Sequence, residues 1–488
     1  MDLRPLAPEL TLTVLGLALL SLDMVVPRDR KRVVGWAGIA GLLAALLVTL
    51  LPSVGLFGRP RLVFFETYAV DPFAAFFKIV AIVSAVLVLL SAMEFFQGRA
   101  TLYEGDVYVL IVFMVLGLVL MAAAADLILL FLAIEFVSLI SYVLAGSLKA
   151  DRQSNEAGIK YFFYGAAASA IMLYGFSYLY GAGRTTNIYH LAQRVATFPP
   201  AFLVVAVVLV LAGLGFKVSL VPFHQWTPDV YEGAPTPIPA FLSVGSKAAG
   251  FAALLRLFYV AFPPQAWVMV LAVIAAFSMS IGNLVALSQR NIKRMLAYSS
   301  IAHAGYILIG VVSLTRPPAP DGSGIIGSGI GAVLYYLLAY TFTNVGAFAV
   351  AIAIERTLGS DAIPDYAGLS QRAPFSAFAM AVFMLSLTGV PPTALFFGKF
   401  FLFAAAIQNG FLWLAVVAIL NSVVSLYYYA GVIWAMYLMA PPDGAGPVAE
   451  GSLTRVLLAV TVAGTLVLGI FPNAFVQLAR TASHLLKL

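Results

Sequence analysis

Apolar residues fill the chain in long runs that short polar connections separate. The runs are roughly 18 to 25 residues long, the length at which an α-helix crosses the hydrocarbon core of a membrane. A transmembrane β-barrel would instead show shorter segments in which apolar and polar residues alternate. The pattern therefore predicts an all-α integral membrane protein with about fourteen spans, at 9–27, 33–52, 71–96, 106–124, 126–148, 160–181, 202–222, 237–262, 265–287, 294–313, 327–356, 373–405, 411–438 and 453–472.

Two of these spans contain prolines close to a lysine. In the seventh, Lys217 is followed by Pro222 and by further prolines up to Pro239, and in the twelfth the segment 389–392 (GVPP) precedes Lys399. Proline removes a backbone donor and clashes with the preceding turn, so each helix is expected to kink or unwind there. Single proline kinks are common in membrane helices. Two interrupted helices in the two halves of one chain, each beside a lysine, favour an internally repeated transporter architecture.

This architecture divides the chain into four parts. Residues 1–105 are expected to form an N-terminal three-helix segment, and residues 439–488 the C-terminal span. Between them, residues 106–262 (spans four to eight) and 263–438 (spans nine to thirteen) are expected to form two inverted five-helix repeats, each with one proline-broken helix.

Composition and charge narrow the classes of function. The chain is 62% hydrophobic and 10% charged, with no Cys and four His. Without Cys it cannot hold thiolate-ligated iron–sulfur clusters, disulfides or Cys-based zinc sites. The net charge is +6, and the basic residues lie in the short loops between spans. Membrane topology therefore explains them better than nucleic-acid binding does. Loops after odd-numbered spans carry more Lys and Arg, so we expect them to face the cytoplasm and both termini to face the outside.

Four ionisable residues lie far from the ends of their predicted spans: Glu135, Lys217, Lys247 and Lys399. Each costs about 3 kcal/mol to place at the centre of a membrane helix, and such residues are usually functional. A buried Glu135–Lys217 ion pair that only fixes helix packing is the alternative, but buried pairs often fail to stabilise a protein. Burial disfavours the charged form of an amine, so a lysine in a dry site becomes able to release its proton. The four residues are therefore candidates for a proton relay.

Three further residues are weaker candidates for the same relay. Lys160 lies just inside the sixth span, where it could equally extend to the membrane surface. His224 follows the break at Pro222, and His303 lies in the tenth span. Imidazole titrates near neutral pH, so either histidine could pass a proton, although a hydrogen-bonded packing role is the alternative. The hydroxyl groups of nearby residues could order water between the charges: Ser138, Ser219, Ser299, Ser300 and Tyr306.

Two long motifs carry a family resemblance. Residues 216–237 (FKVSLVPFHQWTPDVYEGAPTP), continuing to 246–248, and residues 291–306 (NIKRMLAYSSIAHAGY) resemble the antiporter-like membrane subunits of complex I, the proton-pumping NADH–quinone oxidoreductase. The resemblance covers about 106–429. Within the family, residues 156–169 (EAGIKYFFYGAAAS) are most similar to subunit N, and so is Lys399, where subunit M is expected to have Glu.

The resemblance implies a function and a setting. Glu135 and Lys217 would form one half-channel, and Lys247 would connect it to Lys399 in the second. FMN, iron–sulfur clusters and quinone would belong to partner subunits, with no cofactor or metal in this chain and no nucleic acid as partner. The neighbours would be the M-type and K-type subunits and the lipid of a bacterial plasma membrane, with both termini on the periplasmic side. A subunit of a multi-subunit cation/proton antiporter, or a purely structural membrane-arm subunit, are the alternatives.

Overall fold

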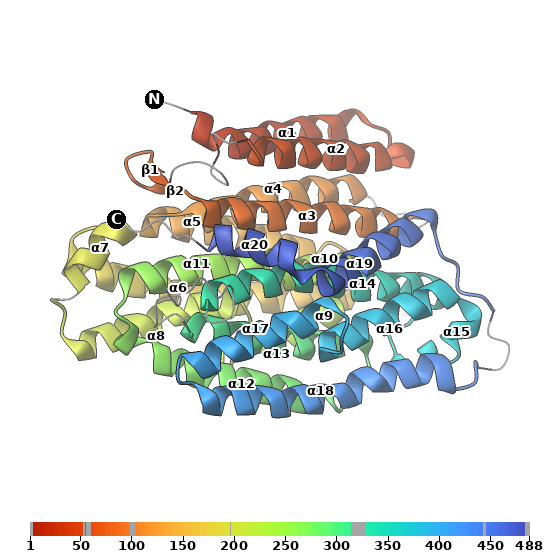
Figure 1. Ribbon diagram of the computed structural model, residues 1–488. Coiled ribbons are helices and arrows are strands. Elements are labelled where there is room, and N and C mark those ends of the chain that lie inside the picture. Colours follow the sequence, from red (N-terminus) through yellow and green to blue (C-terminus); the bar gives the residue numbers. More distant parts are fainter. Residues whose placement is uncertain are drawn as a thin grey trace.

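The computed structural model describes residues 3–51, 54, 60–97, 103–195, 197–313, 328–442 and 446–483. Its long helices lie side by side along one direction, as a set of membrane-spanning helices must (Figure 1). An α-helix satisfies its backbone hydrogen bonds within one segment, which lipid demands of any spanning element.

The first part of the chain forms three long helices and a short hairpin. In order, the elements are α1 (Ala7–Val25), α2 (Arg32–Thr49), β1 (Arg61–Val63), β2 (Tyr68–Val70) and α3 (Pro72–Phe95). The antiparallel hairpin pairs Arg61 with Val70 and Val63 with Tyr68. Asp71 then caps α3, because its side chain accepts a hydrogen bond from the backbone N–H of Ala74. α3 packs against α2 and also against α10, α11 and α14, so it joins the N-terminal helices to the rest of the bundle.

The middle of the chain contains the first broken span. Its elements are α4 (Glu104–Ala123), α5 (Leu127–Ala145), α6 (Arg152–Gly183), α7 (Ile188–Val195), α8 (Pro200–Lys217), α9 (Trp226–Gly233), α10 (Pro237–Phe241), a π-helical segment (Leu242–Ser246) and α11 (Lys247–Ala261). α8 ends at Lys217 and α9 begins at Trp226, so the span opens where its prolines predict a break. The continuous helix from α10 to α11 is buried throughout its central part.

The last part contains the second broken span. Its elements are α12 (Val268–Ala286), α13 (Ile292–Val312), α14 (Gly329–Leu358), α15 (Leu369–Arg372), α16 (Pro374–Thr388), α17 (Ala394–Gln408), α18 (Leu412–Leu438), α19 (Ser452–Ile470) and α20 (Pro472–Ala482). The break between α16 and α17 falls on the predicted GVPP segment, 389–392.

The all-α membrane fold expected from the sequence is confirmed. Within the described ranges, thirteen helices are long and apolar enough to cross a membrane, and α16 and α17 together make the remaining, broken span. Several short elements were not predicted, among them the hairpin, α7, α9, α15 and α20. Each of these is too short to give a membrane-length apolar run, so the hydrophobic pattern does not reveal it.

Candidate functional site

The first predicted pair, Glu135 and Lys217, lies on α5 and α8 without a direct ion pair. Glu135 accepts a hydrogen bond from the Ser169 hydroxyl of α6. The Lys217 amine donates to the Ser138 hydroxyl at 3.1 Å. Ser138 lies one helical turn after Glu135 on α5, so a short polar step separates the carboxylate from the amine. Glu135 is half-buried on the outer face of α5, whereas Lys217 is only 2% exposed.

The break after Lys217 is held by protein groups. The backbone N–H of Val221 donates to the Ser278 hydroxyl at 3.1 Å, and the Trp226 indole donates to the Phe216 carbonyl at 3.1 Å. Trp226 also stacks on Tyr161, with ring centroids 4.2 Å apart. Unwound backbone at membrane depth is tolerated only where such partners satisfy it. The break is therefore a fixed part of the fold.

Lys247 is the first residue of α11, directly after the π-helical segment. Its amine donates to the Ser300 carbonyl at 2.7 Å and to the Ser300 hydroxyl at 2.5 Å. Lys247 is 1% exposed, and within the described part of the chain no carboxylate lies within 4.0 Å of its amine. A Cβ added at Gly250, one turn along α11, would lie 3.5 Å from Lys217 Cγ. The stem of Lys217 thus lies beside α11 at Gly250, one turn after Lys247.

His303 connects Lys247 to the second half of the bundle. Its Nδ1 lies 2.5 Å from the Tyr336 hydroxyl, and its Nε2 lies 3.2 Å from the Tyr429 hydroxyl. Tyr429 in turn lies 2.5 Å from the hydroxyl of Ser299, the residue before the Lys247 partner Ser300. These contacts fit both interpretations of His303, a residue that passes a proton and a hydrogen-bonded packing residue.

Lys399 lies on α17, just beyond the second break. Its amine donates to the carbonyls of Leu387 and Thr388, at 3.0 and 2.8 Å, which are the last two residues of α16. The amine also lies 4.7 Å from the ring centre of Tyr306, one turn after His303 on α13. Lys399 is 4% exposed. It therefore bridges the two halves of its broken span and ends the series of polar contacts that begins at Glu135.

Gly389 offers a specific test of this second break. It has a φ of +92°, and a Cβ added there would lie 3.0 Å from Lys399 Cδ. Gly410 has a φ of +86° with nothing within 4 Å of an added Cβ. A left-handed conformation costs a non-glycine residue about 1–2 kcal/mol. We expect both Gly389→Ala and Gly410→Ala to lower the thermal stability of the purified protein, but only Gly389→Ala to slow proton translocation along the relay predicted from the sequence, because only it displaces Lys399. Equal translocation rates in the two variants would contradict this.

Lys160 and His224 lie apart from the central contacts. The Lys160 amine pairs with Glu156 and Asp229, both at 2.8 Å, near the first turns of α6. Arg294 pairs with the same Asp229 at 3.0 Å, and these side chains line a polar cavity of about 210 Å³. His224 lies in the first break, and its Nδ1 is buried with no hydrogen-bond partner among the described residues. Asp229 and Arg294 were not singled out from the sequence, although both lie within the quoted motifs.

A second buried charge cluster was missed by the sequence analysis. Arg256 on α11 forms two hydrogen bonds to the Asp71 carboxylate, at 2.8 and 3.0 Å, and one to the Tyr189 hydroxyl at 2.9 Å. Both charged side chains are almost completely buried. Arg256 lies near the end of a predicted span and Asp71 at the start of another. Nothing in either position shows that the two meet across 185 residues of sequence.

A third charge cluster lies between α1 and α3. The Lys78 amine is 2.9 Å from the Glu9 carboxylate and donates to the Tyr68 hydroxyl at 2.7 Å, and Tyr68 donates to Glu9 at 2.5 Å. Lys78 could have been found, because it lies well inside the apolar run 71–96. Glu9 could not, because it lies at the edge of its predicted span.

Comparisons with known proteins decide the family. The family described as "NADH:quinone oxidoreductase/Mrp antiporter, TM" matches residues 124–425. NADH-quinone oxidoreductase subunit N of Trichlorobacter lovleyi is 42% identical over 491 residues, which cover 99% of this chain and 98% of the relative. The subunit N of Heliobacterium modesticaldum is 42% identical over 487 residues, 99% of each chain. The chain belongs to the subunit N family.

Solved structures agree with membership in the subunit N family. Respiratory complex I from Thermus thermophilus with bound aureothin contains a chain that is 35% identical, with a TM-score of 0.80 over 96% of this chain and 98% of that one. The Mrp complex from Dietzia sp. contains a chain with a TM-score of 0.84 over 99% of this chain and 97% of that one. At 23% identity, the second likeness shows a shared fold alone.

Proposed function

We propose that the chain is a proton-translocating membrane subunit of a respiratory NADH–quinone oxidoreductase. Membership in the subunit N family supports this function. The observation that carries the proposed relay is the set of half-buried Glu135 and three buried lysines on helices from α5 to α17. Within it, Lys217, Lys247 and Lys399 hold their amines against serine or backbone oxygens, and among the described residues none forms an ion pair. A lysine without a fixed counter-charge is free to exchange its proton.

The order of contacts gives the order of the relay. Glu135 and Lys217 form the first station, and the stem of Lys217 lies beside Gly250, one turn after Lys247 on α11. His303 and its tyrosine partners lead from there to Lys399. The hydroxyls of Tyr231 and Tyr340 are buried without a partner in the described part of the chain, so they can hydrogen-bond water. Water and hydroxyl groups then carry the proton between stations.

In the proposed relay, a proton passes Lys160 and His224 before it reaches Glu135 and Lys217. Lys160 lies on the polar cavity at the beginning of α6, and His224 lies in the break between α8 and α9. We propose that this cavity is the inlet from the cytoplasm and that both termini of the chain face the periplasm of a bacterial plasma membrane. The division into two inverted repeats, 106–262 and 263–438, gives each half one broken helix with a lysine beside the break.

Partner subunits complete the proposed assembly. The redox cofactors FMN, iron–sulfur clusters and quinone belong to those partners, and the expected membrane-arm neighbours are subunits of the M and K types. The half-buried position of Glu135 supports a neighbour against α5, because Leu132 and Leu139 on the same face are 57% and 54% exposed. An acid at a lateral surface needs a covering chain to be shielded from lipid.

The test uses the intact assembly in sealed vesicles. We expect Glu135→Gln and Lys217→Met each to slow NADH-driven proton uptake about tenfold or more, since about 1.4 kcal/mol added to one transfer step has that effect. A pH-sensitive dye and NADH absorbance together give the protons moved per NADH oxidised. Wild-type proton stoichiometry in both variants would overturn the relay. Proton uptake driven by a sodium gradient without NADH would instead indicate a cation/proton antiporter.

A further inference from the structure

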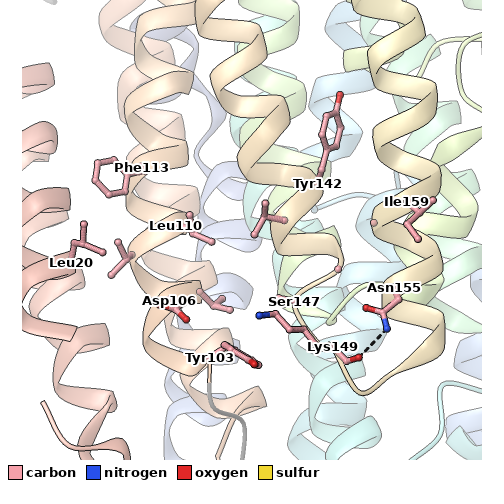
Figure 2. Close-up of a pocket in the computed structure, with 15 residues that line it drawn as sticks. Leu20, Tyr103, Asp106, Leu110, Phe113, Tyr142, Ser147, Lys149, Asn155 and Ile159 are labelled. Atoms are coloured by element: carbon pink, nitrogen blue, oxygen red, sulfur yellow. Dashed lines mark hydrogen bonds between the residues drawn. The ribbon is translucent and has the colours of Figure 1, made fainter. Parts of the chain in front are cut away.

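A large cavity lies between α1, α4, α5 and α6. Its volume is about 720 Å³, within the range of roughly 300–1,000 Å³ typical of small-molecule sites. Figure 2 shows that its walls come from three helix ends and the side of α1. α4 begins there at Glu104, α5 ends at Ala145 and α6 begins at Arg152. Helix ends of membrane spans lie at the membrane surface, so the cavity opens at that level.

The lining changes from polar to apolar along the helix direction. Tyr103, Asp106 and Lys149 lie at the helix ends, whereas Leu110 and Phe113 lie farther along α4 (Figure 2). From Glu104 to Phe113 an α-helix rises about 14 Å. The cavity thus has a charged rim at the membrane surface and an apolar interior at the depth of the acyl chains. This is the polarity profile of a phospholipid.

The rim carries one charge of each sign. The Lys149 amine lies 4.0 Å from the ring centre of Tyr103, and no described carboxylate lies within ion-pair distance of it. Beside it, the buried Ser147 hydroxyl has no hydrogen-bond partner among the described residues. Asp106, on α4 across the cavity, is exposed and forms no ion pair in the described ranges. A cation with a free hydroxyl on one side and an anion on the other complement a headgroup that has both a phosphate and an amine.

We propose that this cavity binds a phospholipid with an amine-bearing headgroup, such as phosphatidylethanolamine. The phosphate lies against Lys149 and Ser147, the primary amine lies against Asp106, and one acyl chain lies along Leu110 and Phe113. The inner wall includes Tyr142, one turn after the Lys217 partner Ser138. The acyl chain therefore keeps bulk water away from the first station of the relay.

The test counts phospholipid retained by the assembly after purification in a mild detergent. Mass spectrometry is expected to find one phosphatidylethanolamine per chain that Val143→Phe removes, because Val143 is 58% exposed and the larger ring fills the cavity. Lys149→Gln is expected to lose the same molecule. Asp106→Asn is expected to retain a phospholipid but to lose the preference for phosphatidylethanolamine over phosphatidylglycerol when both are supplied. Arg152→Gln is the matched control, because Arg152 is the first residue of α6, directly after the same loop, and does not line the cavity.

A photoreactive benzoyl-phenylalanine at Ile159, which lines the cavity, separates a lipid from a neighbouring subunit. Cross-linking to a phospholipid supports the proposal, and cross-linking only to another polypeptide overturns it. Equal phospholipid content in Val143→Phe, Lys149→Gln and the control also overturns it, since such lipid would be bound without regard to this site.

Discussion

Lys247→Arg is expected to stop proton translocation as completely as Lys247→Met, to below a tenth of the wild-type rate, because a proton-transfer step raised by about 1.4 kcal/mol is slowed tenfold. Among the described residues, the hydrogen-bond partners of the Lys247 amine are two Ser300 oxygens, and Lys247 is almost fully buried. Arginine retains the positive charge but does not release its proton at any physiological pH. The pair of variants therefore separates a need for charge from a need for proton exchange.

The measurement is the initial rate of NADH-driven acidification in proteoliposomes that contain the whole assembly. Lys293→Met is the matched control, because Lys293 is also buried but pairs with Asp361 at 2.7 Å at the start of α13, away from the relay. We expect the control to lower stability and to leave the number of protons per NADH unchanged. Wild-type translocation by Lys247→Arg would show that Lys247 acts as a fixed charge.

Arg256→Met is expected to destabilise the protein by about 3–5 kcal/mol, the usual effect of leaving one partner of a buried ion pair without its counter-charge. The group that loses its counter-charge is the Asp71 carboxylate. Asp71 is also the N-cap of α3. Because α3 joins the N-terminal helices to α11 and α14, the loss is expected to loosen the N-terminal segment first.

Unfolding of the detergent-solubilised assembly by denaturant, followed with a protease that cuts opened loops, measures this effect. The double variant Asp71→Asn, Arg256→Gln is the control, because it removes both charges and keeps a side-chain oxygen to cap α3. We expect it to recover much of the lost stability. A single variant as stable as wild-type would show that the ion pair contributes nothing to the fold.

Membrane spans and breaks could be predicted from the sequence because both depend on local chemistry. Apolar runs of membrane length and prolines beside Lys217 and Lys399 are visible without any knowledge of contacts. The same holds for the buried charges: a lysine in the middle of an apolar run is conspicuous wherever its partner lies. Ser138 and Ser300, expected only to order water, instead accept hydrogen bonds directly from lysines.

The partners of the charges could not be predicted, because each pair joins distant segments. A direct Glu135–Lys217 ion pair was one interpretation of the sequence. In the structure Glu135 instead accepts a hydrogen bond from Ser169, and Lys217 donates one to Ser138. The Arg256–Asp71 pair forms only when α11 packs beside the start of α3. The Lys78–Glu9 pair forms only when α1 and α3 come together. Arg256, Asp71 and Glu9 lie near the ends of their predicted spans, where a charge is not conspicuous, whereas Lys78 lies well inside its span. The sequence therefore predicts how deep in the membrane a charged side chain lies more reliably than it predicts which side chain pairs with it.

The contact between Lys399 and the end of α16 couples the protonation of Lys399 to the packing of two half-helices. The partial negative charge at the C-terminal end of a helix favours a cation, and here the amine meets the last two carbonyls of α16 directly. When that amine gives up its proton, the attraction that fastens α17 to α16 weakens. The strength of the contact between α16 and α17 therefore depends on whether Lys399 is protonated. Deprotonation of this one side chain changes how the two half-helices pack against each other.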